Sequence, residues 1–303
     1  MGKFLVAGIL QNETIVNVDT IPIPFKPVTD TFQSIHTSLG GDSYNEALAL
    51  KSLGDFVDYF SMIGKEASAA VLSSPENEIT LYTDYILPKL SATPAAVIFY
   101  DKQKNTQIFE DIKDMRDTPY DLPLFVKQLP TADMVVLANA NFCRPLLRAS
   151  IDAGKKIAVK IRCFRKENEQ YNEDFLSNAH ILYMGDDNLD EDPYDFVKYI
   201  VGKYNPEIVI LGLGAKGVLI YSRYADSYAH YNSIKTNEVV NTLGAGNALF
   251  SCFLHYYNQT HDAAYSIKNA LIFASYKIGF EGTSNGFMTE RQIEDWRPLF
   301  WKD

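Results

Sequence analysis

The segment MVVLANANFCRPLLRASIDAGKKIAVKI, residues 134–161, combines two kinds of hydrophobic pattern. Short apolar runs at 134–138 and 156–161 have the length and composition of buried strands. The residues between them, 141–153, have a helical length and pattern. A strand, a helix and a second strand in this order indicate a right-handed crossover between parallel strands.

The same alternation extends along most of the chain. Further apolar runs lie at 4–10, 57–63, 180–184 and 207–212, and further helical segments lie at 41–54, 165–178 and 191–204. The sequence therefore predicts a Rossmann-like, doubly wound α/β fold around a mostly parallel sheet. No internal repeat, low-complexity tract or long charge block marks a linker, so residues 1–303 are expected to form a single domain.

Two segments interrupt this rhythm. Residues 13–38 and 94–111 are rich in β-branched and aromatic residues and carry Pro, Asn or Asp at plausible turns, which is typical of hairpin strands. We expect them to form a small β-sheet inserted into the main domain. Such a sheet is predicted to act as a lid over the strand ends, and an edge extension or a dimer surface is the alternative.

The composition excludes several classes of protein. The 28 basic and 38 acidic residues give a formal net charge of -10, which opposes general attraction to nucleic acid or to anionic lipid. No apolar run approaches the roughly 18 residues of a membrane span. The three cysteines are scattered singly, which favours a reduced cytoplasmic protein over a disulfide scaffold or a zinc site. Neither nucleic acid nor a membrane is expected as a partner.

One loop has the features of a phosphate site. In NTLGAGNALF, residues 241–250, Gly244, Ala245 and Gly246 precede apolar residues that recur at helical spacing. Small residues at a helix N-terminus let backbone N–H groups approach a charged oxygen, and the helix dipole adds to the attraction. The alternative for these residues is a simple helix-packing device.

A second glycine pattern matches a dinucleotide-binding motif but lacks its structural context. Residues 212–217 match G-x-G-x-x-G after the strand at 207–212, but a β-rich segment follows in place of the helix that a dinucleotide-binding turn must open. A tight turn between two strands fits better, and its backbone is a candidate lining for an adenine or phosphate pocket.

A third glycine site, Gly40-Gly41, precedes a predicted helix that contains Asn45. A glycine turn lets a hydroxylated substrate approach the backbone, and an Asn amide both donates and accepts hydrogen bonds. An ordinary helix start is the alternative.

The acidic stretch at 184–193 resembles a metal site, but a solvated strand-to-helix loop is the favoured interpretation.

Together these segments resemble the ribokinase-like (PfkB) family of carbohydrate kinases over nearly the full chain. The resemblance rests on the order and spacing of GGDSYNEALALKSLG (40–54), FSMIGKEA (60–67), VILGLGAKGVLI (209–220), NTLGAGNALFSCFLHY (241–256) and NALIFASYKIGFEG (269–282). It implies ATP-dependent phosphorylation of a hydroxymethyl group on a sugar, nucleoside or related molecule.

The resemblance also implies roles for particular residues. Substrate hydroxyls are assigned to Asn12, Gly40, Gly41 and Asn45, the anion hole to Gly244, Ala245 and Gly246, and the nucleotide to Gly214, Lys216, Gly217 and Asn285. The cofactors implied are ATP and Mg²⁺, with Asp186 or Asp187 as substitute ligands for the metal. A monovalent cation is implied at the loop that begins with Asn241. A homodimer through the β-lid is a further expectation, since a small sheet leaves edges to cover.

The sequence departs from the family at two acids. The family motif reads Asp-Thr-x-Gly-Ala-Gly-Asp, whose last Asp is the general base, and here the two acids are Asn241 and Asn247. A neutral amide accepts a hydrogen bond but takes up no proton near pH 7. Losing a general base typically lowers a rate by about 10² to 10⁴. Three readings follow: a kinase of weakened activity, a non-catalytic sugar or nucleotide sensor, and a structural protein without a ligand.

Overall fold

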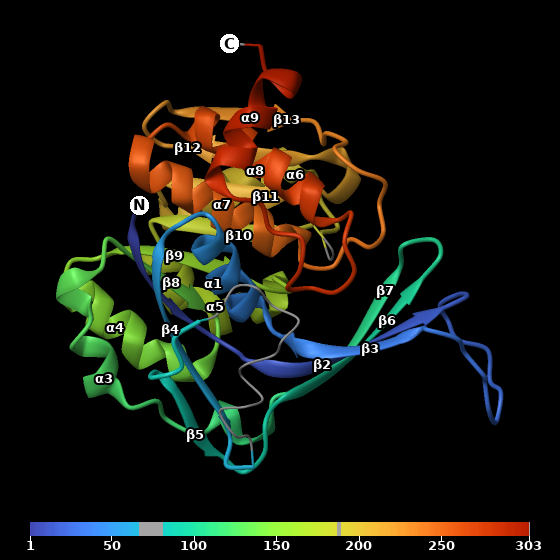
Figure 1. Ribbon diagram of the computed structural model, residues 1–303. Coiled ribbons are helices and arrows are strands. Elements are labelled where there is room, and N and C mark those ends of the chain that lie inside the picture. The colour runs from blue at the N-terminus through green and yellow to red at the C-terminus, as the bar shows by residue number, and fades with distance from the viewer. Residues whose placement is uncertain (67–80, 187–188, 303) are drawn as a thin grey trace.

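The larger of two β-sheets forms the body of the protein. In the computed structural model, which describes residues 1–66, 81–186 and 189–302, its strands lie in the order β13-β12-β11-β10-β9-β8-β1-β4-β5 (Figure 1). The pairs from β11 to β5 are parallel, whereas β12 and β13 are antiparallel at one edge. The strands are β1 (Lys3–Ala7), β4 (Phe56–Gly64), β5 (Ile86–Leu90), β8 (Met134–Ala138), β9 (Lys156–Ile161), β10 (Ile181–Gly185), β11 (Ile208–Gly212), β12 (Val218–Ser222) and β13 (Ser227–Tyr231).

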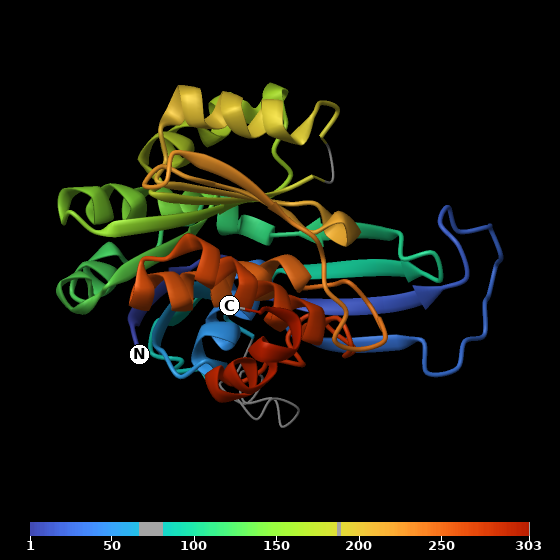
Figure 2. The ribbon, with the colours of Figure 1, turned by 90° about the horizontal axis from the view of Figure 1, so that it is seen from above.

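Helices cover both faces of this sheet, as Figure 2 shows from above. Alternation along β1 sends Phe4 and Val6 into one hydrophobic core and Leu5 and Ala7 into another. The first core is closed by α1 (Asp42–Ser52), α7 (Ala245–Thr260), α8 (Ala263–Lys277) and α9 (Glu290–Phe300). The second is closed by α3 (Leu122–Val126), α4 (Arg144–Asp152), α5 (Glu169–Asn178) and α6 (Pro193–Tyr204).

A second, smaller sheet projects from the body (Figures 1 and 2). Its strands are β3 (Ile35–Gly40), β2 (Gln11–Val18), β6 (Ala95–Asp101) and β7 (Thr106–Asp111), in the order β3-β2-β6-β7. On one face Ile15, Ile98 and Tyr100 pack against Leu243, which lies in the loop before α7. The small sheet is therefore anchored to the loop predicted to bind phosphate.

The predicted fold class is confirmed. Both segments singled out as an inserted sheet supply its strands, although β2 begins before residue 13 and β3 ends after residue 38. The body is doubly wound, because the chain moves from β1 to β4 and β5 and then back to β8 on the opposite side. Ligands of such folds bind at the carboxyl ends of the strands, where the order reverses. Within the described residues, no helix has the length and apolar character needed to cross a membrane.

Candidate functional site

The predicted phosphate loop opens α7. Gly244 is the N-cap residue, with φ 76° and no side-chain cap, and Ala245 and Gly246 follow half-buried. A Cβ on Gly244 would lie 2.6 Å from the Thr283 carbonyl oxygen, and one on Gly246 would lie 2.6 Å from the Tyr183 hydroxyl. These glycines therefore permit both a left-handed turn and close packing. The Ala245 N–H donates to the Thr242 carbonyl at 3.3 Å, whereas the Gly246 N–H lies in the first turn of α7, where the helix itself supplies no acceptor.

Asn247 lies on the first turn of α7 and is 3% exposed. Its side-chain carbonyl accepts a hydrogen bond from Lys160 Nζ, and its Nδ2 donates to Asp42 Oδ1 at 3.0 Å. Lys160 stands near the carboxyl end of β9, where alternation with buried Val159 and Ile161 turns its side chain toward α1 and α7. Both ends of the Asn247 amide are thus bound by charged groups.

Asp42, the first residue of α1, lies at the centre of a charged cluster. The other members of this charged cluster are Glu46, Lys160, Arg162 and Asn247. Asp42 Oδ2 lies 3.2 Å from Lys160 Nζ and 3.9 Å from Arg162 Nε. Burial alone would raise the pKa of Asp42, but Lys160 and Arg162, with the hydrogen bond from Asn247, hold this pKa well below its usual range. Arg162 also donates to Glu110 Oε1 at 2.7 Å, which ties the cluster to β7 of the small sheet.

Glu46 follows Asp42 by one helical turn and contacts the same lysine, with Oε1 4.0 Å from Lys160 Nζ. Its side chain is only 2% exposed, whereas that of Asp42 is 33% exposed. Burial raises the pKa of Glu46 to about 8, with nearby Lys160 opposing and Asp42 adding to the shift. The two carboxyl groups therefore hold different charges at neutral pH.

The predicted substrate turn lies beside β2. Gly41 has φ 110°, and a Cβ there would meet the Ile9 carbonyl oxygen at 2.3 Å, so only glycine fits. The Gly41 N–H donates to Glu13 Oε1 at 2.8 Å, and Thr283 Oγ1 donates to Glu13 Oε2 at 2.6 Å. A Cβ on Gly40 would strike the same carboxylate. Burial raises the pKa of Glu13, while the hydrogen bonds from Thr283 and Gln11 oppose that shift.

Asn12 is adjacent to Glu13 on β2 and, by strand alternation, lies on the opposite face. The side chain that contacts the glycine turn is thus that of Glu13, which the sequence analysis missed. Asn45 is 1% exposed on α1, and its Oδ1 has no hydrogen-bond partner among the described residues. The same holds for Glu46 Oε1 and Gln11 Oε1. Buried acceptors normally have hydrogen-bond donors as partners. The hydroxyl groups of a polyhydroxylated ligand are donors of the kind that these acceptors lack.

The turn at 212–217 joins two antiparallel strands, β11 and β12. Gly214 and Lys216 are exposed in a short 3-10 turn, η5 (Gly214–Lys216). Gly217 has φ 97°, and a Cβ there would strike the Tyr231 carbonyl oxygen at 2.0 Å. The sequence prediction of a turn between two strands, in place of a dinucleotide-binding helix start, is therefore confirmed. Asn285 lies in the loop before α9, where its Nδ2 donates to the Glu281 carbonyl at 3.5 Å.

Asp186 and Asp187 stay predictions as metal ligands. Asp186 follows β10, and its N–H donates to the Gly212 carbonyl at 3.1 Å, while Asp187 lies outside the described residues. In the described part of the chain, no group of three His, Cys, Asp or Glu side chains is arranged to hold a metal ion.

Asn241 fastens the phosphate loop to the chain after α8. Its Nδ2 donates to the Phe280 carbonyl at 3.0 Å, and its Oδ1 accepts from the Leu243 N–H at 3.0 Å. The buried Lys277 donates to the Gly282 carbonyl at 2.7 Å, with its Cε 3.1 Å from the position of a Cβ on Gly244. Burial lowers the pKa of Lys277 to about 8, so its ammonium stays charged at neutral pH next to the start of α7.

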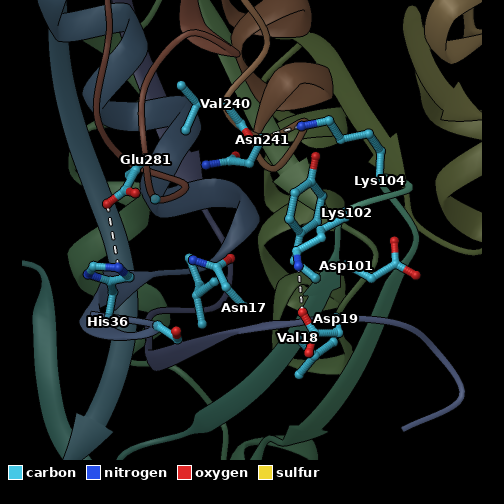
Figure 3. A pocket seen from close by; sticks show the side chains of 14 residues that line it. Asn17, Val18, Asp19, His36, Asp101, Lys102, Lys104, Val240, Asn241 and Glu281 are labelled. Carbon is cyan, nitrogen blue, oxygen red and sulfur yellow. Dashed lines mark hydrogen bonds and ion pairs between the residues drawn. The ribbon is translucent and has the colours of Figure 1, made fainter. Parts of the chain in front are cut away.

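A cavity of about 400 Å³ lies on the other side of this loop, between the small sheet and residues 240–241 and 281–282 (Figure 3). Within it His36 Nε2 lies 3.5 Å from Glu281 Oε2, and Lys104 donates to the Val239 and Val240 carbonyls at 3.2 Å each. Its lining does not include Asp42, Lys160 or Asn247. The cavity and the charged cluster are therefore separate features of the protein.

The doubly wound body, the small projecting sheet and the glycine turn that opens α7 define a ribokinase-like fold. A model of the pfkB family carbohydrate kinases matches residues 1–290, and the chain belongs to this family. The deoxyribokinase of Salmonella typhi is 24% identical over 274 residues, which are 86% of this chain and 88% of that protein.

Solved structures agree with this fold. A microbiome-derived acarbose kinase matches with a TM-score of 0.84 at 19% identity, over 98% of this chain and 99% of its own. The ribokinase of Arabidopsis thaliana, solved with ribose and ATP, matches with a TM-score of 0.77 at 16% identity, over 98% of both chains. At these identities the likeness supports the fold.

Proposed function

We propose that the protein is an ATP-dependent kinase that phosphorylates a hydroxymethyl group of a sugar or a related small molecule. The observation that carries this proposal is the 3.0 Å hydrogen bond between Asn247 Nδ2 and Asp42 Oδ1. It joins the first turn of α7, where the phosphate loop ends, to the first residue of α1, where the substrate turn ends. A phosphate donor and a hydroxyl acceptor held by these two turns would meet at this bond.

The proposed roles follow from this arrangement. The N–H groups at Gly244, Ala245 and Gly246 would stabilise the charge on the transferring phosphoryl group. Substrate hydroxyls would contact Gly40, Gly41, Asn45 and Glu13, and Asn12 is retained as a candidate from sequence. The nucleotide is assigned to Gly214, Lys216, Gly217 and Asn285. Mg²⁺ would accompany ATP near Asp186, and a monovalent cation near Asn241 remains a proposal.

Asn247 has no carboxylate to act as a base, so an unassisted site would turn over slowly. Phosphoryl transfer depends mainly on positioning and electrostatics, which is why the reaction can survive this loss. A sensor that binds sugar or nucleotide without reacting is the second candidate, and it is favoured by the two amides at positions 241 and 247. A nucleoside acceptor and a purely structural role are further alternatives.

The test measures turnover and binding together. ADP release would be followed with ATP, Mg²⁺ and a panel of D-ribose, 2-deoxy-D-ribose, D-fructose and inosine, with the phosphorylated product identified by mass. The kinase proposal expects stoichiometric ADP and phosphorylated acceptor with at least one sugar. A rise in melting temperature with ATP or a sugar, without any product, would favour the sensor. No stabilisation and no product would favour the structural role.

We also propose a homodimer through the small sheet. Phe25, Val28 and Phe32, in the connection between β2 and β3, are 92%, 77% and 85% exposed, and Phe109 on β7 is 56% exposed. Such exposed apolar side chains on a projecting sheet are typical of an interaction surface. Light scattering after gel filtration should give twice the mass of one chain, and the mass of a single chain for the wild type would contradict the proposal.

Use of ATP is consistent with a cytoplasmic location.

A further inference from the structure

The side chains around Asn247 include a carboxylate, that of Asp42, which no sequence motif indicated as part of the site. The orientation of this amide is set by its neighbours, because an ammonium requires the carbonyl oxygen and a carboxylate requires the NH₂ group. Lys160 meets the oxygen, and Asp42 accepts from the nitrogen at 3.0 Å. The carboxylate nearest to the phosphate loop in this cluster is therefore that of Asp42, on the substrate side.

Two carboxyl groups face Lys160 in this cluster, and they differ in access. The Asp42 side chain is 33% exposed at the start of α1, whereas that of Glu46 is 2% exposed one turn further into the protein. The lowered pKa of Asp42 keeps it ionised at neutral pH. Glu46, with a pKa raised by burial to about 8, already holds a proton there. Asp42 is thus the accessible, ionised member of the pair.

We propose that Asp42 is the proton acceptor of the kinase reaction and takes the role that Asn247 cannot fill. This inference rests on the proposed function and deepens it. The acceptor hydroxyl oxygen forms a bond to the γ-phosphorus of ATP, while the bond from that phosphorus to the β,γ-bridging oxygen breaks and its electron pair leaves with ADP. The hydroxyl proton passes to a carboxylate oxygen of Asp42 and then to water.

The strong ion pairs of Asp42 are compatible with this role. In a loose transition state the hydroxyl proton becomes acidic only as the new P–O bond forms, so a weak base in the correct position is sufficient. Lys160 and Arg162 also place positive charge next to the site where the phosphoryl group carries negative charge. Asn247 becomes a positioning residue, because its Nδ2 holds one oxygen of Asp42.

The test exchanges the two side chains. Asp42→Asn removes the carboxylate with little change in shape, Asn247→Asp adds a second one, and the double variant D42N/N247D moves it across the hydrogen bond. Asp152→Asn, at an exposed i,i+4 pair with Arg148 on α4, is the matched control. Each variant is assayed for kcat and KM with ATP and the sugar that gives most product with the wild type.

Asp42→Asn should lower kcat by about 10² to 10⁴, the usual effect of losing a general base, and leave KM for ATP within about threefold. Asn247→Asp should not raise kcat, because two carboxylates about 3 Å apart do not both ionise readily. The double variant should exceed Asp42→Asn by at least about tenfold, because the carboxylate acts from the facing position. Asp152→Asn should match the wild type.

Three outcomes would overturn the inference. A kcat for Asp42→Asn within about threefold of the wild type would overturn it while leaving the kinase proposal intact, since a lost base changes the rate far more. A gain of about tenfold in Asn247→Asp would restore the catalytic role to position 247. No product from the wild type or any variant would overturn both proposals. If Asp42→Asn does not unfold cooperatively, Asp42→Ser takes its place in the same comparison, with the same expected loss of kcat and the same contradicting result.

Discussion

The starts of α1 and α7 have similar backbones and opposite chemistry. Each helix has a glycine N-cap with positive φ, Gly41 at 110° and Gly244 at 76°, and neither glycine provides a side-chain cap. By contrast, α8 and α9 are capped by Asp262 and Thr289. The open N-termini suit ligands at both sites. The start of α7 carries amides at 241 and 247, whereas that of α1 carries acids at 42 and 46. The acid groups thus lie at the start of α1, which is the side proposed to hold the substrate.

The largest expected effect comes from removing the cation between the two sides. Lys160→Met leaves the ionised Asp42 without its nearest ammonium, and breaking a buried ion pair costs about 3 to 5 kcal/mol. Urea unfolding at pH 7 measures the change. Lys156→Met is the matched control on β9, because its ion pair with Glu207 is more exposed and is worth about 1 kcal/mol or less. Equal losses in the two variants would contradict the central role of Lys160.

A second effect tests the buried acid of α1. Because the pKa of Glu46 is raised from 4.5 to about 8, folding takes up a proton between these values, so wild-type stability falls as pH rises through this window. Glu46→Gln removes that dependence. The variant should gain about 2 to 4 kcal/mol relative to the wild type between pH 5 and pH 8, measured by urea unfolding. A constant difference across this range would show that Glu46 titrates normally.

A third effect concerns the backbone at the start of α7. Gly244→Ala forces a side chain into positive φ and places its Cβ 2.6 Å from the Thr283 carbonyl. We expect a loss of about 2 to 3 kcal/mol of unfolding free energy, with a matching loss of activity. Gly154→Ala is the control, since it also has positive φ but nothing within 4 Å, and it should cost about 1 kcal/mol. A smaller loss at Gly244 than at Gly154 would argue against a constrained loop.

The smallest expected effect tests whether a monovalent cation binds near the loop that begins with Asn241. Asn241→Asp removes the donor to the Phe280 carbonyl and places two acceptors 3.0 Å apart, which should cost about 1 to 2 kcal/mol. Thermal unfolding in K⁺, compared with a bulky organic cation at equal ionic strength, provides the measurement. Selective rescue by K⁺ would support a monovalent-cation site, and equal losses in both salts would argue against one.

The sequence was sufficient for the fold and for the backbone of the site. Strand and helix patterns predicted the doubly wound body, and Gly244, Ala245 and Gly246 do open α7 as expected. These predictions depended on local periodicity and on short contiguous motifs, which are the strongest signals in a single sequence.

The side chains of the cluster were harder to find because they come from separate segments. Lys160 reads as part of an apolar strand, and only its place near the carboxyl end of that strand signals a site. Asp42 reads as the start of a helix. On β2 the sequence favoured Asn12, whereas Glu13 contacts the glycine turn, and this shift of one residue changes the face of the strand.

The central claim is that Asp42 supplies the proton-accepting carboxylate that position 247 lacks. Its most direct test is the ratio of kcat for D42N/N247D to kcat for Asp42→Asn. With ATP and the best sugar acceptor, we predict a ratio of about 10 or more, because the double variant regains a carboxylate beside the reacting hydroxyl. A ratio near 1, with both proteins folded and with Asp42→Asn as active as the wild type, would contradict the account.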